Sequence, residues 1–246
     1  MELINHNKRG EKMNTNRKAA IIAGVLFIAA TAASLLGTSF TQSILDAPDY
    51  LVKISANQSQ VTLGVLFQFI AAVTSAGIAI SLYPTLRRHN EGLALGSVGF
   101  RIMEGVFYIV AALGLLSLLS LSQEYVKAGA PAASDFQILG TLILAGRNWA
   151  SFGFAVISFC LGALMYYYVF FQSKLIPRWL SGWGLIAIAL LLAMALFVMF
   201  GAQPSGTTLL LAVPIAVQEM VLAVWLIAKG FNPAAIASGS AKADMD

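Results

Sequence analysis

Six long apolar stretches constrain this chain more than any other feature of its sequence. They cover residues 18–40, 60–86, 92–121, 136–171, 179–200 and 207–228. A helix of about 20 apolar residues is long enough to cross the hydrocarbon core of a bilayer. The third and fourth stretches are longer than that, so we expect them to tilt or to extend beyond the hydrocarbon. The sequence therefore predicts an all-α membrane protein, a single bundle of six transmembrane helices.

The composition excludes the other broad classes. Hydrophobic residues make up 59% of the 246 residues and charged residues only 11%, whereas a soluble domain carries about 25% charged residues. The mean hydropathy is +0.80. The net charge is +4, but no basic face interleaves with aromatic residues, so we expect no nucleic-acid partner. Membrane lipid is the expected partner.

Lysine and arginine residues are unequally divided between the two sides of the predicted topology. With a cytoplasmic N-terminus, eleven of the fifteen lie inside, and only Lys53 and Lys127 lie outside. The inside set is Lys8, Arg9, Lys12, Arg17, Lys18, Arg87, Arg88, Lys174, Arg178, Lys229 and Lys242. Cytoplasmic loops are enriched in Lys and Arg. The split predicts that both termini are cytoplasmic. Tyr166, Tyr167 and Tyr168 are expected at the same membrane interface.

The segments outside the spans are short. Residues 1–17 are predicted to be a polar cytoplasmic extension, in which Met13 is an alternative start to Met1. The apolar run that follows exceeds the ~7–15 residues of a signal peptide, which favours a retained anchor. Residues 18–230 form the transmembrane domain, and residues 231–246 a disordered cytoplasmic tail. In the loop 46–58, Tyr50, Leu51 and Ile54 share one face of a short helix that is expected to lie on the membrane.

Four ionisable residues lie in or against the apolar stretches: Arg101, Glu104, Arg147 and Glu219. A charge at the bilayer centre costs at least ~2.5–3.5 kcal/mol, so such residues usually face inward, pair and mark a function. At ~1.5 Å per residue, the four lie ~14–18 Å inside their spans. These depths converge near the midplane of a ~30 Å core. The pair Arg101 and Glu104, three residues apart, shares a helix face.

Asn148 and Gln218, next to Arg147 and Glu219, complete the predicted network for ligand binding or buried charge. Two alternatives stay open. Residues 105–122 could nearly span alone, which would place Arg101 and Glu104 at the cytoplasmic interface, and residues 150–171 could span alone, which would leave Arg147 near the outside. An ion pair between Glu219 and Arg147 or Arg101 could also be purely structural. Glu219 has apolar residues on both sides and needs a partner, a proton or water.

The sequence lacks the residues that several kinds of cofactor or metal site require. His6 and His89 lie outside the spans, which removes paired histidine ligands for haem and most zinc sites. No phosphate-binding glycine loop is present. Cys160, the only cysteine, is expected to be a small buried or lipid-facing side chain. We therefore expect no cofactor and no metal, and an enzymatic activity is not favoured.

Several segments resemble one known family. They are residues 100–104 with Arg101 and Glu104, residues 173–180 between the fourth and fifth spans, Glu219 with residues 225–226 and 229–230, and residues 54–59. The chain from Arg17 to Gly230 resembles the domain of unknown function 4386 family, bacterial integral membrane proteins without an assigned activity. The resemblance implies a multi-pass protein of the bacterial inner (plasma) membrane. It gives no role to any residue.

These observations predict a membrane protein that binds or moves a small molecule or ion at a polar pocket near the midplane. Arg101 and Arg147 would hold an anionic group, and Glu104 and Glu219 would orient the arginines or exchange a proton. The alternative is a structural or regulatory membrane partner whose internal charges only fix helix packing. The sequence does not indicate an oligomeric state.

Overall fold

A computed structural model describes residues 2–131, 135–200 and 210–243, with side chains described for residues 15–131, 135–197, 199–200 and 210–239. All regular elements in these ranges are helices. They are α1 (Glu2–Leu45), α2 (Tyr50–Ala56), α3 (Gln58–Leu86), α4 (Glu91–Lys127), α5 (Asp135–Asn148), the π-helix η1 (Trp149–Phe154), α6 (Ala155–Ser173), α7 (Arg178–Met199), the 3₁₀ turn η2 (Leu210–Ala212), α9 (Val213–Ala228) and α10 (Pro233–Ala243).

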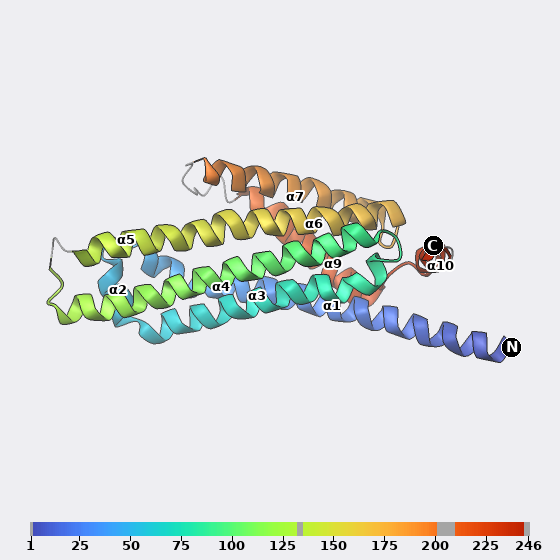
Figure 1. The fold of residues 1–246 in the computed structure, drawn as a ribbon, viewed down its shortest axis with the longest axis horizontal. Coiled ribbons are helices and arrows are strands. Elements are labelled where there is room, and N and C mark those ends of the chain that lie inside the picture. The colour runs from blue at the N-terminus through green and yellow to red at the C-terminus, as the bar shows by residue number, and fades with distance from the viewer. Residues whose placement is uncertain (1, 132–134, 201–209, 244–246) are drawn as a thin grey trace.

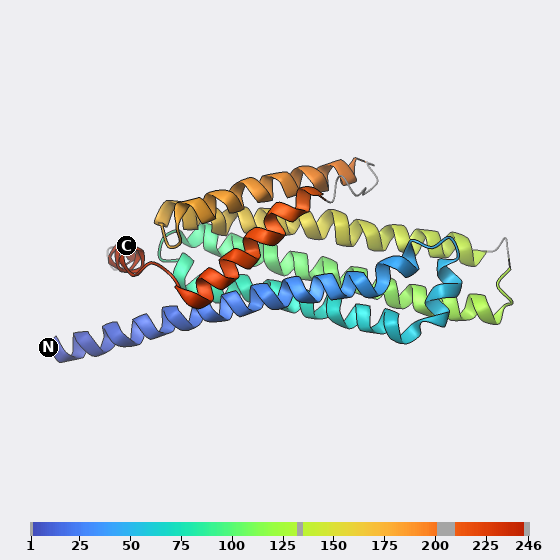
Figure 2. The ribbon, with the colours of Figure 1, turned by 180° about the vertical axis from the view of Figure 1, so that it is seen from behind.

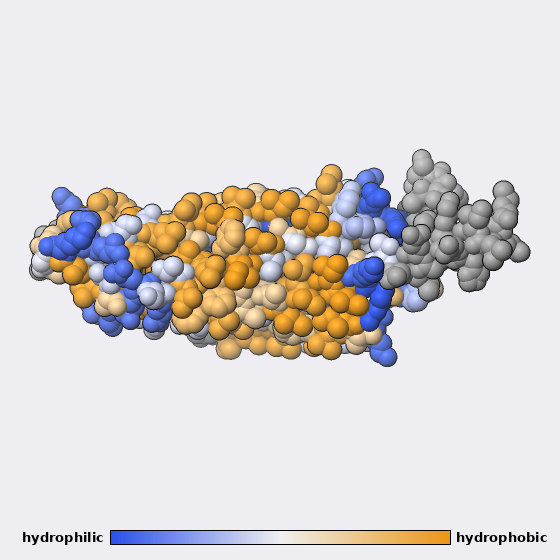
Figure 3. Space-filling model, turned by 90° about the horizontal axis from the view of Figure 1, so that it is seen from below, coloured by the Kyte–Doolittle hydropathy of each residue, from blue (hydrophilic) through white to orange (hydrophobic). Residues whose placement is uncertain are grey.

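Six helical segments of the described chain are long and apolar enough to cross a membrane, which confirms the predicted number of spans. Their ranges are Thr15–Leu45, Gln58–Leu86, Glu91–Lys127, Asp135–Ser173, Arg178–Phe197 and Leu210–Ala228. Large apolar side chains cover the outside, among them Leu35 at 67% and Ile186 at 65% exposure. Figure 3 shows apolar residues over the middle of one face and hydrophilic residues toward its ends. Such a surface fits contact with lipid chains.

The six spanning segments form a ring in chain order. Helix α1 packs against α3, α3 against α4, α4 against α6, α6 against α7, and α7 against α9. Helix α9 then returns to pack against α1 and crosses the bundle obliquely (Figure 2). The inside of the ring is therefore lined by all six segments, and a polar side chain there is removed from lipid.

Both chain termini lie at one end of the bundle, called here the terminal end, and α2 lies at the other, called the loop end (Figure 1). An even number of spans requires this arrangement. Helix α4 begins at the terminal end, where the Asn90 side chain accepts a hydrogen bond from the Leu93 N–H at 2.9 Å. Glu91 in its first turn and Lys127 in its last turn complement the helix dipole.

The C-terminal segment departs from the sequence prediction of a disordered tail, because Pro233–Ala243 forms helix α10. Two contacts explain this. Phe231 and Ala235 are buried, and the Phe231 ring lies 6.1 Å from the Phe170 ring on α6. The Asn232 side chain accepts a hydrogen bond from the Ala234 N–H at 3.1 Å, which caps the new helix. Docking, which local composition does not reveal, supports this helix.

The short helix in the first loop also differs from its prediction. Helix α2 forms, but Leu51 and Ile54 are buried within the protein, at 3% and 0% exposure. They belong to an apolar cluster with Leu115 and Leu118 of α4. The face predicted to lie on the membrane thus covers the loop end of the bundle. The amphipathic pattern of a short helix does not distinguish lipid from a protein partner.

Candidate functional site

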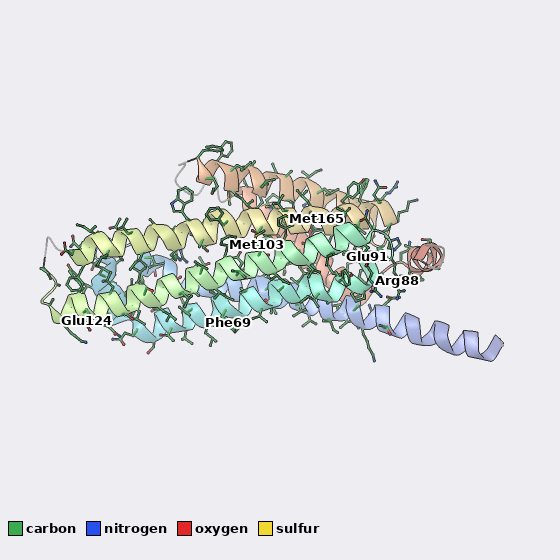
Figure 4. All side chains as sticks on the ribbon, in the orientation of Figure 1. Phe69, Arg88, Glu91, Met103, Glu124 and Met165 are labelled. Atoms are coloured by element: carbon green, nitrogen blue, oxygen red, sulfur yellow. The ribbon has the colours of Figure 1, made fainter. Side chains whose placement is uncertain are left out.

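Arg101 and Glu104 form an ion pair inside the ring. Arg101 Nη1 lies 2.9 Å from Glu104 Oε2, and the two side chains are 2% and 4% exposed. Their spacing of three residues on α4 permits this contact, as the sequence predicts. Met103, next to Glu104, lies along the middle part of α4, between Glu91 and Glu124 near its ends (Figure 4). The charge of Arg101 is therefore compensated within its own helix.

Two neighbouring helices, α3 and α6, enclose the Arg101 side chain. Its Nε donates to the Ser75 carbonyl oxygen of α3 at 3.3 Å, and its Cζ lies 4.6 Å from the centre of the Phe159 ring on α6. A Cβ at Gly162 of α6 would lie 3.1 Å from Arg101 Cγ. Glycine at this position is what lets α6 approach so closely. Arg101 is thus packed as part of the α3–α4–α6 contact.

Glu219 of α9 faces the same interior from the opposite side of the ring. It interacts electrostatically with both Arg101 and Glu104. Its Oε1 is buried and forms no hydrogen bond of good geometry, although the residue as a whole is partly exposed. The Tyr166 hydroxyl, next to this carboxylate, is also buried without a well-formed hydrogen bond. Among the residues with described side chains, Glu219 therefore has the Tyr166 hydroxyl beside it and the attraction of Arg101, but no salt bridge.

Gln218 belongs to a hydrogen-bonded chain that joins three helices. Its Oε1 accepts from the Tyr167 hydroxyl of α6, and its Nε2 donates to the Leu180 carbonyl oxygen of α7 at 3.0 Å. Gln218 is fully buried. Gly184 of α7 lies against the Tyr167 ring, which leaves no room for a Cβ there. Both polar ends of Gln218 are satisfied, so it fixes α9 against α6 and α7.

Arg147 does not join this group. It packs against Gly114 of α4, where a Cβ would lie 3.0 Å from Arg147 Cβ. Gly114 is thirteen residues beyond Arg101 on α4, about 20 Å further toward the loop end at 1.5 Å per residue. The predicted convergence of all four charges is therefore wrong for Arg147. The sequence prediction counts the depth of Arg147 from the start of the fourth span. That segment, Asp135–Ser173, has 39 residues and is longer than a bilayer requires, so its start does not mark the membrane boundary.

Arg147 has its own surroundings near the loop end. Its Nη1 donates to Asn148 Oδ1 at 2.9 Å, its Cζ lies 5.4 Å from the Phe152 ring centre, and Asp46 at the end of α1 attracts it. Its Nε is buried without a hydrogen-bond partner. The π-helix Trp149–Phe154 follows directly. Such a widened turn shifts the register of the residues around it.

Two tyrosines that the sequence predicts at the membrane interface lie instead among the interior polar residues. We call Arg101, Glu104, Tyr166, Tyr167, Gln218 and Glu219 the interior group. Tyr166 and Tyr167 are fully buried, whereas Tyr168 is 48% exposed. Consecutive helical residues point in directions about 100° apart, so three adjacent tyrosines cannot all face the interface. Tyr166 follows Gly162 by one helical turn on the same face. That spacing is the signal that could have assigned it to the interior.

The interior group can hold charge but offers little for covalent or metal chemistry. Within the described chain, no group of three or more His, Cys, Asp or Glu side chains could hold a metal ion. Cys160 is buried. What the group supplies is one ion pair, Arg101–Glu104, and a second carboxylate, Glu219. With all three ionised, its net charge is negative.

Comparison with known proteins adds the family. A family model described as "Domain of unknown function (DUF4386)" matches residues 22–230. No curated protein and no solved structure matches the chain. The match covers all six spanning segments except residues 15–21 at the start of the first one. The chain is therefore an integral, multi-pass membrane protein that belongs to the family with this domain of unknown function.

Proposed function

We propose that this protein, placed in the bacterial inner (plasma) membrane with both termini cytoplasmic, binds a proton or a monovalent cation at Glu219. The observation that carries the proposal is the buried Glu219 carboxylate oxygen, which forms no salt bridge with any residue whose side chain is described and has only the Tyr166 hydroxyl as a hydrogen-bonding neighbour. A buried charge without compensation is costly in an apolar interior. A bound proton or cation supplies that compensation.

The charge balance of the interior group favours a positive ligand. Arg101 contacts Glu104 at 2.9 Å, so these two charges cancel, and Glu219 leaves one negative charge over. The earlier expectation that Arg101 holds an anionic group is not supported, since its side chain is enclosed by α3 and α6. Arg147 lies too far along the bundle to contribute.

The partial exposure of Glu219 supports access to it. Glu104 is 3% exposed, whereas Glu219 is partly exposed on α9 while one of its oxygens faces the interior. Helix α9 crosses between α1 and α7 (Figure 2). A carboxylate in this position can exchange a proton or small cation between the interior and the outer surface of the ring.

A hydrophobic carbodiimide tests the proposal, because it reacts with protonated carboxyl groups in apolar surroundings. We expect it to label Glu219 in the purified full chain, with a rate that falls as pH rises. If a metal cation is the ligand, Na⁺ or K⁺ slows the labelling at constant pH. Peptide mass spectrometry locates the label.

Glu124→Gln is the matched control, because Glu124 is a carboxylate near the loop end of α4 (Figure 4) that pairs with Lys127 at 2.6 Å. This variant should retain labelling at Glu219, and Glu219→Gln should lose it. Labelling that is absent from Glu219 over the whole pH range would overturn the proposal. So would equal labelling of Glu124 and Glu219.

The second candidate is a structural or regulatory role in which the interior charges only fix helix packing. The enclosure of Arg101 by two neighbouring helices favours it. Buried polar groups can specify one arrangement of helices. This candidate requires Glu219 to stabilise the folded bundle together with the Arg101–Glu104 pair. It therefore predicts a lower free energy of unfolding when Glu219 is neutralised.

A further inference from the structure

A cavity of about 590 Å³ opens at the terminal end of the bundle, away from the interior charges. Its walls are the turn between α6 and α7, residues 174–178, and the segment between α9 and α10, residues 229–233, together with Trp225. Helix α10 lies beside this turn (Figure 1). Its volume falls within the ~300–1,000 Å³ range of ligand pockets.

Hydrogen bonds hold the two walls together. The Asn232 N–H donates to the Leu175 carbonyl oxygen at 2.8 Å, and Asn232 Nδ2 donates to the Lys174 carbonyl oxygen at 3.3 Å. Lys174 has φ 58° and Gly230 has φ 72°, so both turns contain a left-handed residue. Leu175 is fully buried. The cavity is therefore largely formed before any ligand binds, which lowers the entropy cost of binding.

Three cationic side chains line the cavity, Lys174, Arg178 and Lys229, and its lining includes no acidic residue. All three side chains are exposed. Among the residues with described side chains, none forms a salt bridge with any of them. Arg178 Cζ lies 5.3 Å from the centre of the Phe171 ring, a contact that leaves its N–H groups free to donate at the ring edge. Together the three cations favour a ligand with more than one negative oxygen.

The nearby helix ends add to this preference. Helix α7 begins at Arg178 on the cavity wall, which places the positive end of its dipole there. The last carbonyl groups of α9 would oppose an anion, but Arg17 of α1 donates to the Leu226 carbonyl oxygen at 3.0 Å and to that of Ile227. The negative end of α9 is therefore neutralised from within the protein.

The cavity lies where three spanning segments end: Asp135–Ser173, Arg178–Phe197 and Leu210–Ala228. Trp225 lines it, and Trp179 beside it is 58% exposed. Tryptophan side chains mark the headgroup level of a membrane. A ligand in this cavity is therefore within reach both of lipid headgroups and of the adjoining water.

We propose that the cavity between the α6–α7 turn and the α9–α10 segment binds a phosphate-bearing anion, held by Lys174, Arg178 and Lys229. Lys and Arg side chains and a helix N-terminus are the groups that hold phosphate oxygens in proteins. The ligand is an anionic lipid headgroup or a soluble phosphate ester. This site is separate from Glu219, so either proposal can fail alone.

Thermal unfolding of the full chain in a neutral detergent tests the site, with three probes at constant ionic strength. They are dioctanoyl phosphatidylglycerol, dioctanoyl phosphatidylcholine and glycerol phosphate. We expect phosphatidylglycerol to raise the unfolding midpoint in a saturable way, and phosphatidylcholine to do so far less. A matching response to glycerol phosphate identifies a soluble ester as the ligand, whereas a response to phosphatidylglycerol alone identifies a lipid headgroup.

Lys174→Gln with Lys229→Gln should weaken the apparent affinity by about tenfold or more, since two charge-assisted contacts are lost. The matched control is Lys53→Gln with Lys127→Gln, which removes two exposed lysines at the loop end and should leave the affinity unchanged. Arg178→Gln is an independent variant that leaves both turns intact and should also weaken binding. Equal weakening in the cavity and control variants, or no response of the unaltered chain to any probe, would overturn the proposal.

Discussion

Arg101 contributes to the structure through its contacts with other helices as much as through its charge. Its partners are Glu104 on the same helix, the Ser75 carbonyl on α3 and the Phe159 ring on α6. Removing one member of a buried ion pair leaves an uncompensated charge, which costs about 3–5 kcal/mol. Replacing both members by apolar residues of similar volume is often neutral. The pair can therefore be tested as a unit.

Arg101→Leu alone is expected to lower the free energy of unfolding by about 3–5 kcal/mol, because Glu104 is left buried without a partner. The double variant Arg101→Leu, Glu104→Leu should recover most of this loss. Unfolding of the purified chain in mixed micelles measures both values. A double variant that is as unstable as the sum of the single variants would show that the two side chains do not interact.

At the scale of single residues, the sequence predicts the Arg101–Glu104 pair but not which other side chains lie near it. The spacing of Arg101 and Glu104 within one helix is local, so the contact follows from helix geometry. The position of Arg147 depends on where a 39-residue segment meets α4, and helix packing decides that. The burial of Tyr166 and Tyr167 depends on which face of α6 turns inward. Such information is not local.

At the scale of the elements, glycine positions decide how closely the helices approach. Gly162 on α6 has Arg101 Cγ, Phe100 Cβ and the Ser97 carbonyl oxygen within 3.1–3.2 Å of where a Cβ would lie. Gly99 on α4 has no atom of another helix within 4 Å of where a Cβ would lie. Both residues are glycines within helices, but only Gly162 is tightly packed. Gly99 is therefore a suitable control for a substitution at Gly162.

Gly162→Ala is expected to destabilise the chain by about 1–3 kcal/mol, because the added methyl group forces α4 and α6 apart. Gly99→Ala should be neutral or slightly stabilising, since alanine favours the helix and meets no neighbour. The same unfolding assay compares them. Equal effects of the two substitutions would contradict the close α4–α6 contact.

Length and apolar character are sufficient to predict the six spanning segments, but not how the smaller helices pack. Helix α10 depends on the burial of Phe231 and Ala235 against the bundle. Helix α2 shows the expected amphipathic face, with Leu51 and Ile54 on it, yet this face contacts α4. The spacing of apolar residues along a helix is the same whether its apolar face contacts lipid or another part of the protein. Only the assembled bundle distinguishes the two.

At the scale of the whole molecule, the ring closes because α9 packs against α1. Gly24 on α1 meets the Ala223 carbonyl oxygen, 2.7 Å from where a Cβ would lie. Arg17 then joins α1 to the last carbonyl groups of α9. Contacts between the first and last spans therefore close the ring of helices.

The proposed orientation predicts which loops face the cytoplasm. Cys160 is buried, so single cysteines introduced in a Cys160→Ala background report on accessibility. A membrane-impermeant thiol reagent on the outer side of the membrane should label cysteines at Asn57 and Lys127, and should not label those at His89 and Lys174 until the membrane is opened. The positive-inside distribution is the physical reason. Labelling of Lys127 and Lys174 positions from the same side would contradict the six-span topology.

We propose that the two interior carboxylates differ in role: Glu104 compensates Arg101, and Glu219 binds the ligand. Unfolding of Glu104→Gln and Glu219→Gln, each measured over a range of pH and of Na⁺ or K⁺ concentration, tests this most directly. We expect Glu104→Gln to lose about 3–5 kcal/mol of stability, and Glu219→Gln to keep its stability but lose the response to pH or cation. If Glu219→Gln is as destabilised as Glu104→Gln, both carboxylates belong to one structural pair with Arg101, and the ligand-binding role of Glu219 is wrong.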